Sequence, residues 1–281
     1  MLARAKINLY LHVVGKRDDG YHLLDSLIVF AETGDEIKVA EAGDLSLAID
    51  GPFGAGLTKD AGNLVMRAAL ALRELTDTKR GAAIHLTKNL PLASGIGGGS
   101  ADAAATLRAL IELWRVKPDE AALMRLAEKL GADVPVCLAG RASFVGGIGE
   151  EIASAGRLPE THILLVNPLV ETPTPAVFKA RRGDFSAPAR WQSVPPNAEA
   201  LATYLDARRN DLTEPAIVVA PVVANVLAAI AATPNCLLSR LSGSGATCFG
   251  LYQTAAEAEA ARQLLVSQHP HWWFAAAALS H

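Results

Sequence analysis

The sequence has few cysteines, and their spacing gives no metal or redox motif. Cys137, Cys236 and Cys248 are its three thiols, and no two of them form a C-x-x-C pair. We expect buried, reduced thiols of the kind found in a reducing compartment. This scarcity argues against a metal or redox centre built on cysteine.

Long hydrophobic runs are also missing. The most apolar segment, residues 216–232, is shorter than the roughly 20 residues that span a bilayer, and Pro221 and Asn225 interrupt it. We therefore predict a buried helix there. The start, MLARAKINLYLHVVG, is interrupted by Asn8 and His12, and no small-residue cleavage site follows. We expect no signal peptide, no membrane association and a cytoplasmic location.

An excess of positive charge is absent as well. The formal net charge is -3, with 20% charged and 51% apolar residues. Nucleic-acid binding depends on clustered Lys and Arg, so this composition argues against a nucleic-acid partner. It is typical of a globular protein, and local basic patches remain available for a small anionic ligand.

The length predicts two domains, since 281 residues exceed the usual size of one. Glycines at 146, 147 and 149 and a polar stretch up to Pro159 give the best boundary. We expect domains at residues 1–155 and 156–281.

The first half of the chain alternates predicted strands and helices. Residues 5–13 and 23–30 are expected to form a hairpin around the turn at residues 16–20, followed by strand-like alternation over residues 37–49. Periodicity then predicts a helix at residues 63–75, a strand at 83–87, a helix at 100–114 and a helix at 119–130. The last helix is expected to end at Gly131 in a left-handed cap, with Pro135 preventing continuation and Asp133 in a tight connection.

The second half has an α+β pattern. It predicts a strand at residues 162–166, a short helix at 175–180, a mobile surface loop at 183–196, helices at 198–207 and 222–232, and a hairpin near 242–245. Another helix and an apolar segment at residues 272–277 complete this half.

A glycine run carries the clearest chemical signal. The segment from Pro91 to Leu107 joins a strand to an Ala-rich helix through a run with four glycines in five positions. The glycines are Gly95, Gly97, Gly98 and Gly99, and Ile96 is the fifth residue. Such a run leaves backbone N–H groups accessible, and the helix N-terminus adds partial positive charge. We therefore predict a phosphate site; a plain tight loop would not need so many helix-breaking residues.

Two common phosphate motifs do not fit this run. A Walker loop requires a Lys after the glycines, and none follows. The dinucleotide pattern G-x-G-x-x-G fails because Ser100 or Asp102 occupies the last position. A cation for the phosphates must come from elsewhere in the chain.

Three segments resemble, in order, the motifs of the GHMP superfamily of small-molecule kinases: AKINLYLHVVGKRDDGYHLLDSL, PLASGIGGGSADAA and LSGSGATCFGLY. The superfamily's second motif has the form P-x-x-x-G-L-G-S-S-A-A. Within it, the triple glycine, AKINLYL, DGYHLL and GADVP are similar to the members that phosphorylate 4-diphosphocytidyl-2-C-methyl-D-erythritol (CDP-methylerythritol) in the non-mevalonate isoprenoid pathway.

This resemblance implies a fold and a reaction. The fold is α+β with two domains, a ferredoxin-like second domain and an active site in the cleft between them. The reaction is transfer of the γ-phosphate of ATP to the 2-hydroxyl of CDP-methylerythritol, with Mg²⁺ offsetting phosphate charge. The expected partner is this small molecule, and the expected state is a monomer or weak homodimer.

The resemblance also implies the catalytic pair. Asp133 in GADVP matches the family's catalytic aspartate, which accepts the hydroxyl proton, and Lys6 matches its N-terminal lysine, which keeps that carboxylate ionised. The alternatives are a helix-capping or turn aspartate and a solvated lysine at a strand edge.

Further positions follow from the same match. Tyr21 and His22 correspond to residues that stack on and hydrogen-bond the cytosine, although ordinary hairpin packing is the alternative. The implied sugar or diphosphate contacts, for which strand-end capping is the alternative, are Asn8, Thr172 and Thr174. The implied nucleotide-binding residues are Asn63, Lys88, Pro91, Leu92, Ala93, Ser94, Gly95, Ile96, Gly97, Gly98, Gly99, Ser100 and Ala101. A capping Asn63 and an exposed Lys88 are the alternatives for the first two.

One departure from the family concerns the metal. Members often have two serines after the triple glycine, whereas here Ser100 is followed by Ala101. Ser100, backbone amides or water must replace the missing hydroxyl, so the sequence names no protein ligand for Mg²⁺.

Two other functions remain open. A GHMP kinase for homoserine or mevalonate would have less use for Tyr21 and His22. A noncatalytic binding protein on the same fold would not need both Lys6 and Asp133.

Overall fold

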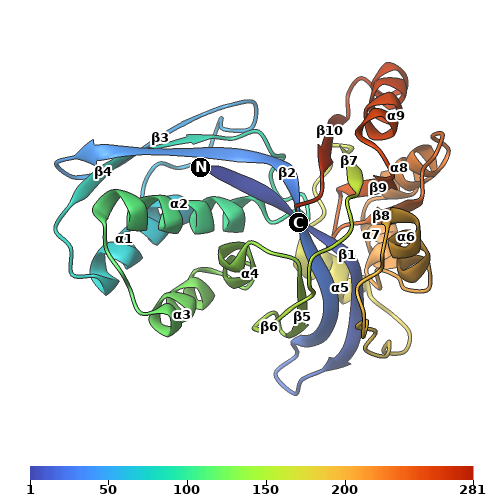
Figure 1. The fold of residues 1–281 in the computed structure, drawn as a ribbon, viewed down its shortest axis with the longest axis horizontal. Helices are drawn as coiled ribbons and strands as arrows, with labels where there is room; N and C mark the ends of the chain where they lie inside the picture. The colour runs from blue at the N-terminus through green and yellow to red at the C-terminus, as the bar shows by residue number, and fades with distance from the viewer. Residues whose placement is uncertain (281) are drawn as a thin grey trace. The chain divides into compact units, whose positions relative to one another are not determined.

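The structure, a computed structural model that describes residues 1–280, divides into two compact units (Figure 1). The first unit comprises residues 1–5, 33–92 and 97–140; the second comprises residues 6–32, 93–96 and the chain from Arg141 onward. Helices and strands are mixed, which confirms the α+β class. The expected domain boundary at residues 155 and 156 stays a prediction.

The first unit contains a sheet from three strands. β2 (His22–Ala42) pairs antiparallel through its last residues with β4 (Gly81–Thr87), and β4 pairs parallel with β3 (Leu45–Asp50). α1 (Leu64–Leu75) and α2 (Gly98–Trp114) pack against each other, and Figure 1 shows both along one side of these strands. Ile37, Ile84 and Leu86 are buried.

The helices of the first unit follow the sequence pattern closely. α2 begins within the glycine run, at Gly98, and Leu107, Leu110 and Trp114 of its predicted apolar stripe are buried. α3 (Glu120–Leu130) starts after Asp119, whose carboxylate accepts a hydrogen bond from the Ala122 N–H at 2.9 Å. These two predictions are confirmed.

The end of α3 shows one wrong prediction and one helix that the sequence did not predict. Gly131 has a φ of 167°, so its backbone is extended and the expected left-handed cap is absent. Pro135 also starts a helix, α4 (Val134–Ala139), because proline is tolerated in a first turn, where its missing N–H has no intrahelical partner.

The second unit begins with the predicted hairpin. β1 (Leu2–Lys16) pairs with β2, and its turn is closed by the Gly20 N–H donating to the Arg17 carbonyl at 3.0 Å. The early part of β2 also pairs antiparallel with β5 (Ser143–Gly147), which pairs in turn with β6 (Glu151–Ser154). The glycine-rich stretch that the sequence suggested as a boundary is therefore part of a β-hairpin.

A separate four-stranded sheet follows. Its order is β10 (Trp273–Ala278), β7 (His162–Asn167), β9 (Cys248–Tyr252) and β8 (Leu238–Leu241), with every neighbouring pair antiparallel. α8 (Val222–Ala231) and α9 (Ala255–Gln268) pack on these strands. In chain order the sheet reads fourth, first, third, second strand, which is the ferredoxin-like arrangement.

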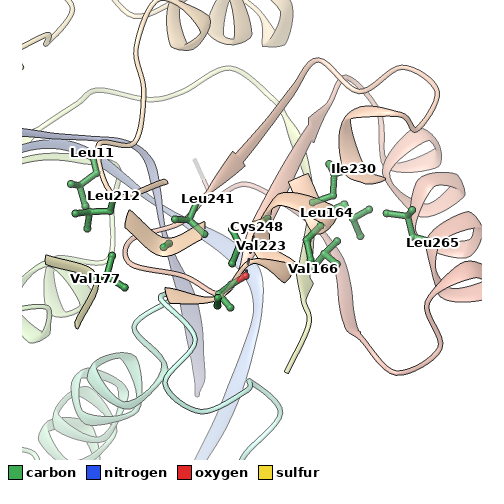
Figure 2. Close-up of a cluster of buried hydrophobic side chains, with 14 of the residues drawn as sticks. Leu11, Leu164, Val166, Val177, Leu212, Val223, Ile230, Leu241, Cys248 and Leu265 are labelled. Atoms are coloured by element: carbon green, nitrogen blue, oxygen red, sulfur yellow. Dashed lines mark hydrogen bonds between the residues drawn. The ribbon is translucent and has the colours of Figure 1, made fainter. Parts of the chain in front are cut away.

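The core of the second unit lies between this sheet and its helices (Figure 2). Leu164 and Val166 are alternate residues of β7 and so project from the same face. Val223 and Ile230 from α8 and Leu265 from α9 join them in one buried cluster, as does Leu11 from β1. The β1 strand is thus part of this core.

The connecting segments complete the unit. α5 (Thr174–Ala180) and α6 (Ala198–Asp206) match the predicted helices. The apolar segment 216–232 was predicted as one buried helix, but it divides between α7 (Thr213–Val219) and α8, because Pro221 interrupts it. Of the helices within residues 1–280, none combines the length and apolar character needed to cross a membrane.

Candidate functional site: a glycine run, a buried lysine cluster and a polar loop

The first half of the glycine run is held by backbone contacts in the second unit. The Thr247 N–H donates to the Ser94 carbonyl at 3.1 Å, and the Ser242 hydroxyl donates to the Gly95 carbonyl at 3.2 Å. Gly95 has a φ of +75°, and a Cβ there would lie 2.5 Å from the Ser242 carbonyl oxygen. Only glycine allows this approach, so the run and the loop at residues 242–245 (the SGSG loop) are fitted to each other.

The second half of the run opens α2 in the first unit. Gly97 occupies the N-cap position with a φ of 64°, and its residue type supplies no capping side chain. A Cβ added to Gly99 would have no heavy atom of the described residues within 4 Å. The first N–H groups of a helix have no intrahelical partner, so this end offers donors, partial positive charge and open space to an anion.

Lys88 is buried beside this helix start. Its Nζ lies 2.5 Å from Oδ2 of Asp35 and 2.7 Å from Oδ2 of Asp102, and all three side chains are almost fully buried. The exposed lysine considered as an alternative is therefore wrong. Burial by itself would lower the pKa of Lys88, but the nearby Asp102 and Asp35 carboxylates outweigh it and raise the pKa.

Lys6 lies in a buried polar chain of the second unit. Its ammonium donates to Oδ1 of Asn8 at 2.9 Å, and the Asn8 side chain donates to the Ser26 hydroxyl at 2.8 Å. The Asn8 N–H also donates to the Ser242 hydroxyl at 3.2 Å. Lys6 and Asn8 are both 4% exposed, which excludes a solvated lysine at a strand edge.

Asp133 precedes α4 in the first unit. It occupies the N-cap position, with φ -88° and ψ -8°, but its side chain makes no capping hydrogen bond to that helix. The capping role considered as an alternative is therefore excluded. Asp133 is half-buried, within a tight connection between α3 and α4, as expected.

The aromatic pair lies at the hairpin end. Tyr21 is 62% exposed, whereas the His22 ring stacks on Phe178 of α5 with centroids 5.0 Å apart. Partial burial lowers the pKa of His22, and the positive charges of Lys16 and Arg181 lower it further. A neutral imidazole can both donate and accept one hydrogen bond, which suits the edge of a nucleobase.

Thr172 and Thr174 reach the SGSG loop from the other side. The Thr174 hydroxyl lies 2.8 Å from the Ser244 hydroxyl. Thr172 is buried, and its Oγ1 has no hydrogen-bond partner among the described residues. An unpartnered buried hydroxyl is unusual and costs free energy, so it is a donor or acceptor available to a ligand.

Asn63 caps α1. Its Oδ1 accepts from the Val65 N–H at 2.9 Å, and its Nδ2 donates to the Thr58 carbonyl at 2.8 Å. The capping alternative is thus observed, and a nucleotide contact by Asn63 stays a prediction. Among the flanking positions, Pro91, Ser94, Ile96 and Ala101 are buried and Leu92 is 44% exposed.

The SGSG loop brings together several of the predicted residues of the second unit. Beyond its contacts with Gly95, Asn8 and Thr174, a Cβ on Gly245 would lie 3.5 Å from the Thr172 hydroxyl. In the first unit, Gly98 lies next to Lys88, since its Cβ position is 3.0 Å from Nζ. The predicted residues thus form one group around the SGSG loop in the second unit and another around Lys88 and Gly98 in the first unit.

Sequence reasoning missed several of these residues. Ser242 and Ser244 stand in LSGSGATCFGLY, a recognised motif that could have been assigned to the site. Asp102 stands in the glycine motif itself. Asp35 and Phe178 had no local signal, because strand and helix pairings far apart in the sequence bring them into place.

Metal ligands are not grouped in the described residues: no three His, Cys, Asp or Glu side chains within residues 1–280 could together hold an ion. Mg²⁺ bound mainly through nucleotide phosphates needs few protein ligands. The Ser100 hydroxyl, half-buried at the start of α2, fits that requirement.

Two family models match different parts of the chain. Residues 63–141 match the GHMP kinases N terminal domain, and residues 196–270 match the GHMP kinases C terminal domain. The first match contains the glycine run and Asp133, and the second contains the SGSG loop.

Individual proteins give a closer assignment. A 4-diphosphocytidyl-2-C-methyl-D-erythritol kinase of Paramagnetospirillum magneticum is 57% identical over 277 residues, covering 99% of this chain and 97% of that protein. A crystal structure of 4-(cytidine 5'-diphospho)-2C-methyl-D-erythritol kinase is 32% identical, with a TM-score of 0.83 over 100% of this chain and 99% of that one.

More distant structures show the fold alone. A homoserine kinase from Cytophaga hutchinsonii is 18% identical, with a TM-score of 0.66 over 99% of this chain and 92% of that one. The α+β fold is therefore shared with a kinase that is named for a different substrate. On the strength of the closer relatives, the chain belongs to the GHMP kinases and, within them, to the family of 4-diphosphocytidyl-2-C-methyl-D-erythritol kinases.

Proposed function

We propose that this protein transfers the γ-phosphate of ATP to the 2-hydroxyl of CDP-methylerythritol, a step of the non-mevalonate isoprenoid pathway. The observation that carries this proposal is the 57% identity to a relative of that name over almost the whole chain. Membership of a kinase family implies ATP as the phosphate donor. The geometry of the described residues supports a role for each group.

The glycine run is proposed to hold the ATP phosphates. The start of α2 offers unpaired N–H groups, and the open space beside Gly99 lets phosphate oxygens approach the backbone. Residues from Pro91 to Ala101 shape this segment. Ser100 would contribute its hydroxyl to Mg²⁺, which when bound offsets phosphate charge.

Asp133 is proposed as the base that accepts the proton of the 2-hydroxyl. Its position matches the family's catalytic aspartate, and a carboxylate is the type of group that accepts such a proton. Lys6 is proposed to supply positive charge that offsets the charge on the attacking oxygen. Asn8 orients Lys6 through its 2.9 Å hydrogen bond.

The cytidine end is proposed to bind at the β1–β2 hairpin. The exposed Tyr21 ring offers a stacking face, and His22, oriented by its stack on Phe178, offers hydrogen bonds to the base. Base stacking on an aromatic ring contributes about 1 to 3 kcal/mol. Thr172, with its unpartnered buried hydroxyl, and Thr174 would contact the sugar or diphosphate.

A coupled assay for ADP release tests the proposal directly. Purified protein is given ATP and Mg²⁺ with CDP-methylerythritol, mevalonate or homoserine in parallel, and product is identified by mass. We expect release with CDP-methylerythritol at a kcat/KM far above that with the other two alcohols. Preference for mevalonate or homoserine would reassign the substrate, and no release with any of them would favour a noncatalytic binding protein.

The remaining expectations belong to the same proposal. We expect a cytoplasmic monomer or weak homodimer, acting on a small molecule and without a nucleic-acid or membrane partner. The division into domains at residues 1–155 and 156–281, with the site in the cleft between them, also remains a prediction. Light scattering of the purified protein and expression of fragments would test the assembly state and the boundary.

A further inference from the structure

A buried charge cluster lies immediately beside the glycine run, and it has no place in the proposed chemistry. Lys88 donates to Asp35 at 2.5 Å and to Asp102 at 2.7 Å, and the three residues are at most 3% exposed. Placing charged groups out of water is costly unless they are paired and hydrogen-bonded. A chain keeps such an arrangement only where some gain offsets that cost.

The cluster joins three elements that define the run. Asp35 belongs to β2, Lys88 follows the end of β4, and Asp102 lies in α2. The second oxygen of Asp35 accepts from the Asn89 N–H at 2.6 Å and the Leu90 N–H at 2.8 Å. Asp35 therefore fixes the backbone that leads into the run, and Asp102 fixes α2 through its contact with Lys88.

The cluster fills the space beside the run where a side chain at residue 98 would lie. A Cβ on Gly98, the first residue of α2, would lie 3.0 Å from the Lys88 ammonium and 3.6 Å from Oδ2 of Asp35. The ammonium thus supports the backbone of the first helical turn. A change in the cluster would be felt by the same N–H groups that are proposed to hold phosphate.

The cluster contains two acidic side chains and one basic side chain. Two carboxylates face one ammonium, and Oδ1 of Asp102 is buried without a hydrogen-bond partner among residues 1–280. Burial raises the pKa of the Asp102 carboxyl, although the Lys88 charge opposes this. The two buried ion pairs of Lys88 have few alternative geometries, because moving any of the three side chains would leave a buried group unpaired. The cluster is therefore suited to fixing the position of α2.

We propose that Lys88, Asp35 and Asp102 are positioning residues for the ATP phosphates, acting through the backbone of the glycine run rather than by touching the nucleotide. For Lys88 this differs from the contact with the adenine nucleotide that the family resemblance implies. The inference rests on the proposed function in one respect: ATP is the ligand of the run.

The test uses paired variants and two nucleotides. Asp102→Ala removes the carboxylate, Asp102→Asn keeps an oxygen for Lys88, and Lys88→Met/Asp102→Asn removes the ammonium without leaving two buried carboxylates unpaired. Val226→Ala, a core substitution in α8, serves as the control for lost stability. Affinity for non-hydrolysable ATP and GTP analogues is measured by calorimetry, and KM for each substrate by the ADP assay.

We expect Asp102→Ala and the double variant to weaken the ATP and GTP analogues by the same factor, because both carry the same phosphates. A misplaced phosphate site should lower kcat/KM for ATP by about tenfold to a hundredfold, while KM for the alcohol is unchanged. Asp102→Asn should recover most of the loss, and Val226→Ala should leave nucleotide affinity as it is.

Three outcomes would overturn the inference. A change in the ratio of ATP to GTP affinity would mean that Lys88 reads the base directly. An equal loss for ATP and the alcohol, or a loss matched by Val226→Ala, would mean general destabilisation. Unchanged nucleotide affinity in a folded variant would mean that the cluster does not position the run. Since calorimetry requires no acceptor, these results stand even if the wild-type protein fails to phosphorylate CDP-methylerythritol.

Discussion

Asp133 and Lys6 are the two side chains on which the proposed chemistry depends. We expect Asp133→Asn to remove the proposed base and Lys6→Ala to remove the proposed positive charge, and each should lower kcat by about 100-fold to 10,000-fold, the range for a positioned acid or base. The ADP assay measures this loss, and circular dichroism checks that the fold is retained. Asp77→Asn and Lys79→Ala are matched controls, because these two residues form an ion pair at the surface. The Asp77 side chain is 91% exposed and the Lys79 side chain is 89% exposed.

A folded Asp133→Asn protein with wild-type turnover would assign the proton transfer to another group. Normal turnover in Lys6→Ala would likewise show that the ammonium orients Asn8 without affecting the reaction. The controls should match the wild type in both rate and stability. A loss of rate in either control would reveal a general effect of charge rather than a specific role.

His22 gives a prediction about pH. Its lowered pKa keeps the imidazole neutral at neutral pH, and protonation would replace an acceptor by a second donor at the base edge. KM for CDP-methylerythritol should therefore stay constant at neutral pH and rise only below the ordinary histidine pKa of about 6.5. Measuring KM from pH 8 to pH 5 in wild type and His22→Gln checks this.

The glutamine variant should have a raised KM that no longer changes in that range. If His22→Gln keeps the wild-type pH profile of KM, a group other than His22 is responsible for the rise of KM at low pH. KM for ATP serves as the internal control, since the proposed phosphate site does not involve His22.

Among the elements, the segment at residues 183–196 is a surface loop, as predicted, and a buried carboxylate holds it at one point. It contains no helix or strand, but Asp25 of β2 binds it firmly. The buried Asp25 carboxylate accepts from the Ala189 N–H and from Nε of Arg190, both at 2.8 Å, and from the Tyr10 hydroxyl at 2.9 Å. Trp191 adds a 3.0 Å hydrogen bond to the Ala155 carbonyl.

We expect Asp25→Ala to release this segment and to lower the free energy of unfolding by about 1 to 3 kcal/mol, because a buried N–H and hydroxyl lose their acceptor. Limited proteolysis should then cut within residues 183–196, and urea unfolding gives the loss of stability. Arg190→Ala is the milder comparison, since that side chain is 37% exposed. Equal resistance to protease in Asp25→Ala and wild type would contradict the anchoring role.

At the scale of the whole molecule, the core of the second unit is completed by an element from the start of the chain. Leu11 and Val13 of β1 belong to the buried cluster that contains Val177 and Leu212. The Leu11 N–H donates to the Arg209 carbonyl at 3.1 Å, and the Val13 N–H donates to the Asp211 carboxylate at 2.7 Å. A chain cut near residue 156 would lose all of these contacts.

A fragment of residues 156–281 should therefore fold poorly by itself. Each missing aliphatic side chain removes about 1.5 to 3 kcal/mol of burial, and the β1 strand also takes its hydrogen bonds with it. Urea titration followed by circular dichroism should show a broad transition, in contrast to the full-length chain. A sharp, cooperative transition in the fragment would instead support independent folding at the boundary expected from the sequence.

The elements that the sequence predicted well are those fixed by neighbouring residues. α2 follows from its apolar spacing and from the glycine run that leads into its first turn, and α3 follows from the Asp119 cap. The failures had a different cause. Whether Pro135 ends a helix or starts one depends on the path of the chain into α4, and this is set by packing rather than by the residue itself.

The candidate site divides in the same way. The glycine run could be assigned to phosphate binding because its property is local: backbone N–H groups at a helix start with no side chains to cover them. The family motifs added Lys6 and Asp133. The partners of Lys88, by contrast, lie 53 and 14 residues away from it, and no local pattern marks Asp35 as one of them.

The sequence by itself determined the α+β class and the kinase family, and it located the glycine run that we propose to bind phosphate, because these depend on residue types at short spacings. Only the tertiary structure decided that Lys88 is buried between two acidic side chains. It also decided that the SGSG loop forms hydrogen bonds with Asn8, Gly95 and Thr174. The hydrogen bond between Asp25 and the segment at residues 183–196 likewise depends on the fold. The physical reason is that charge pairing and burial depend on distances in space, and chain folding sets these distances between residues far apart in sequence.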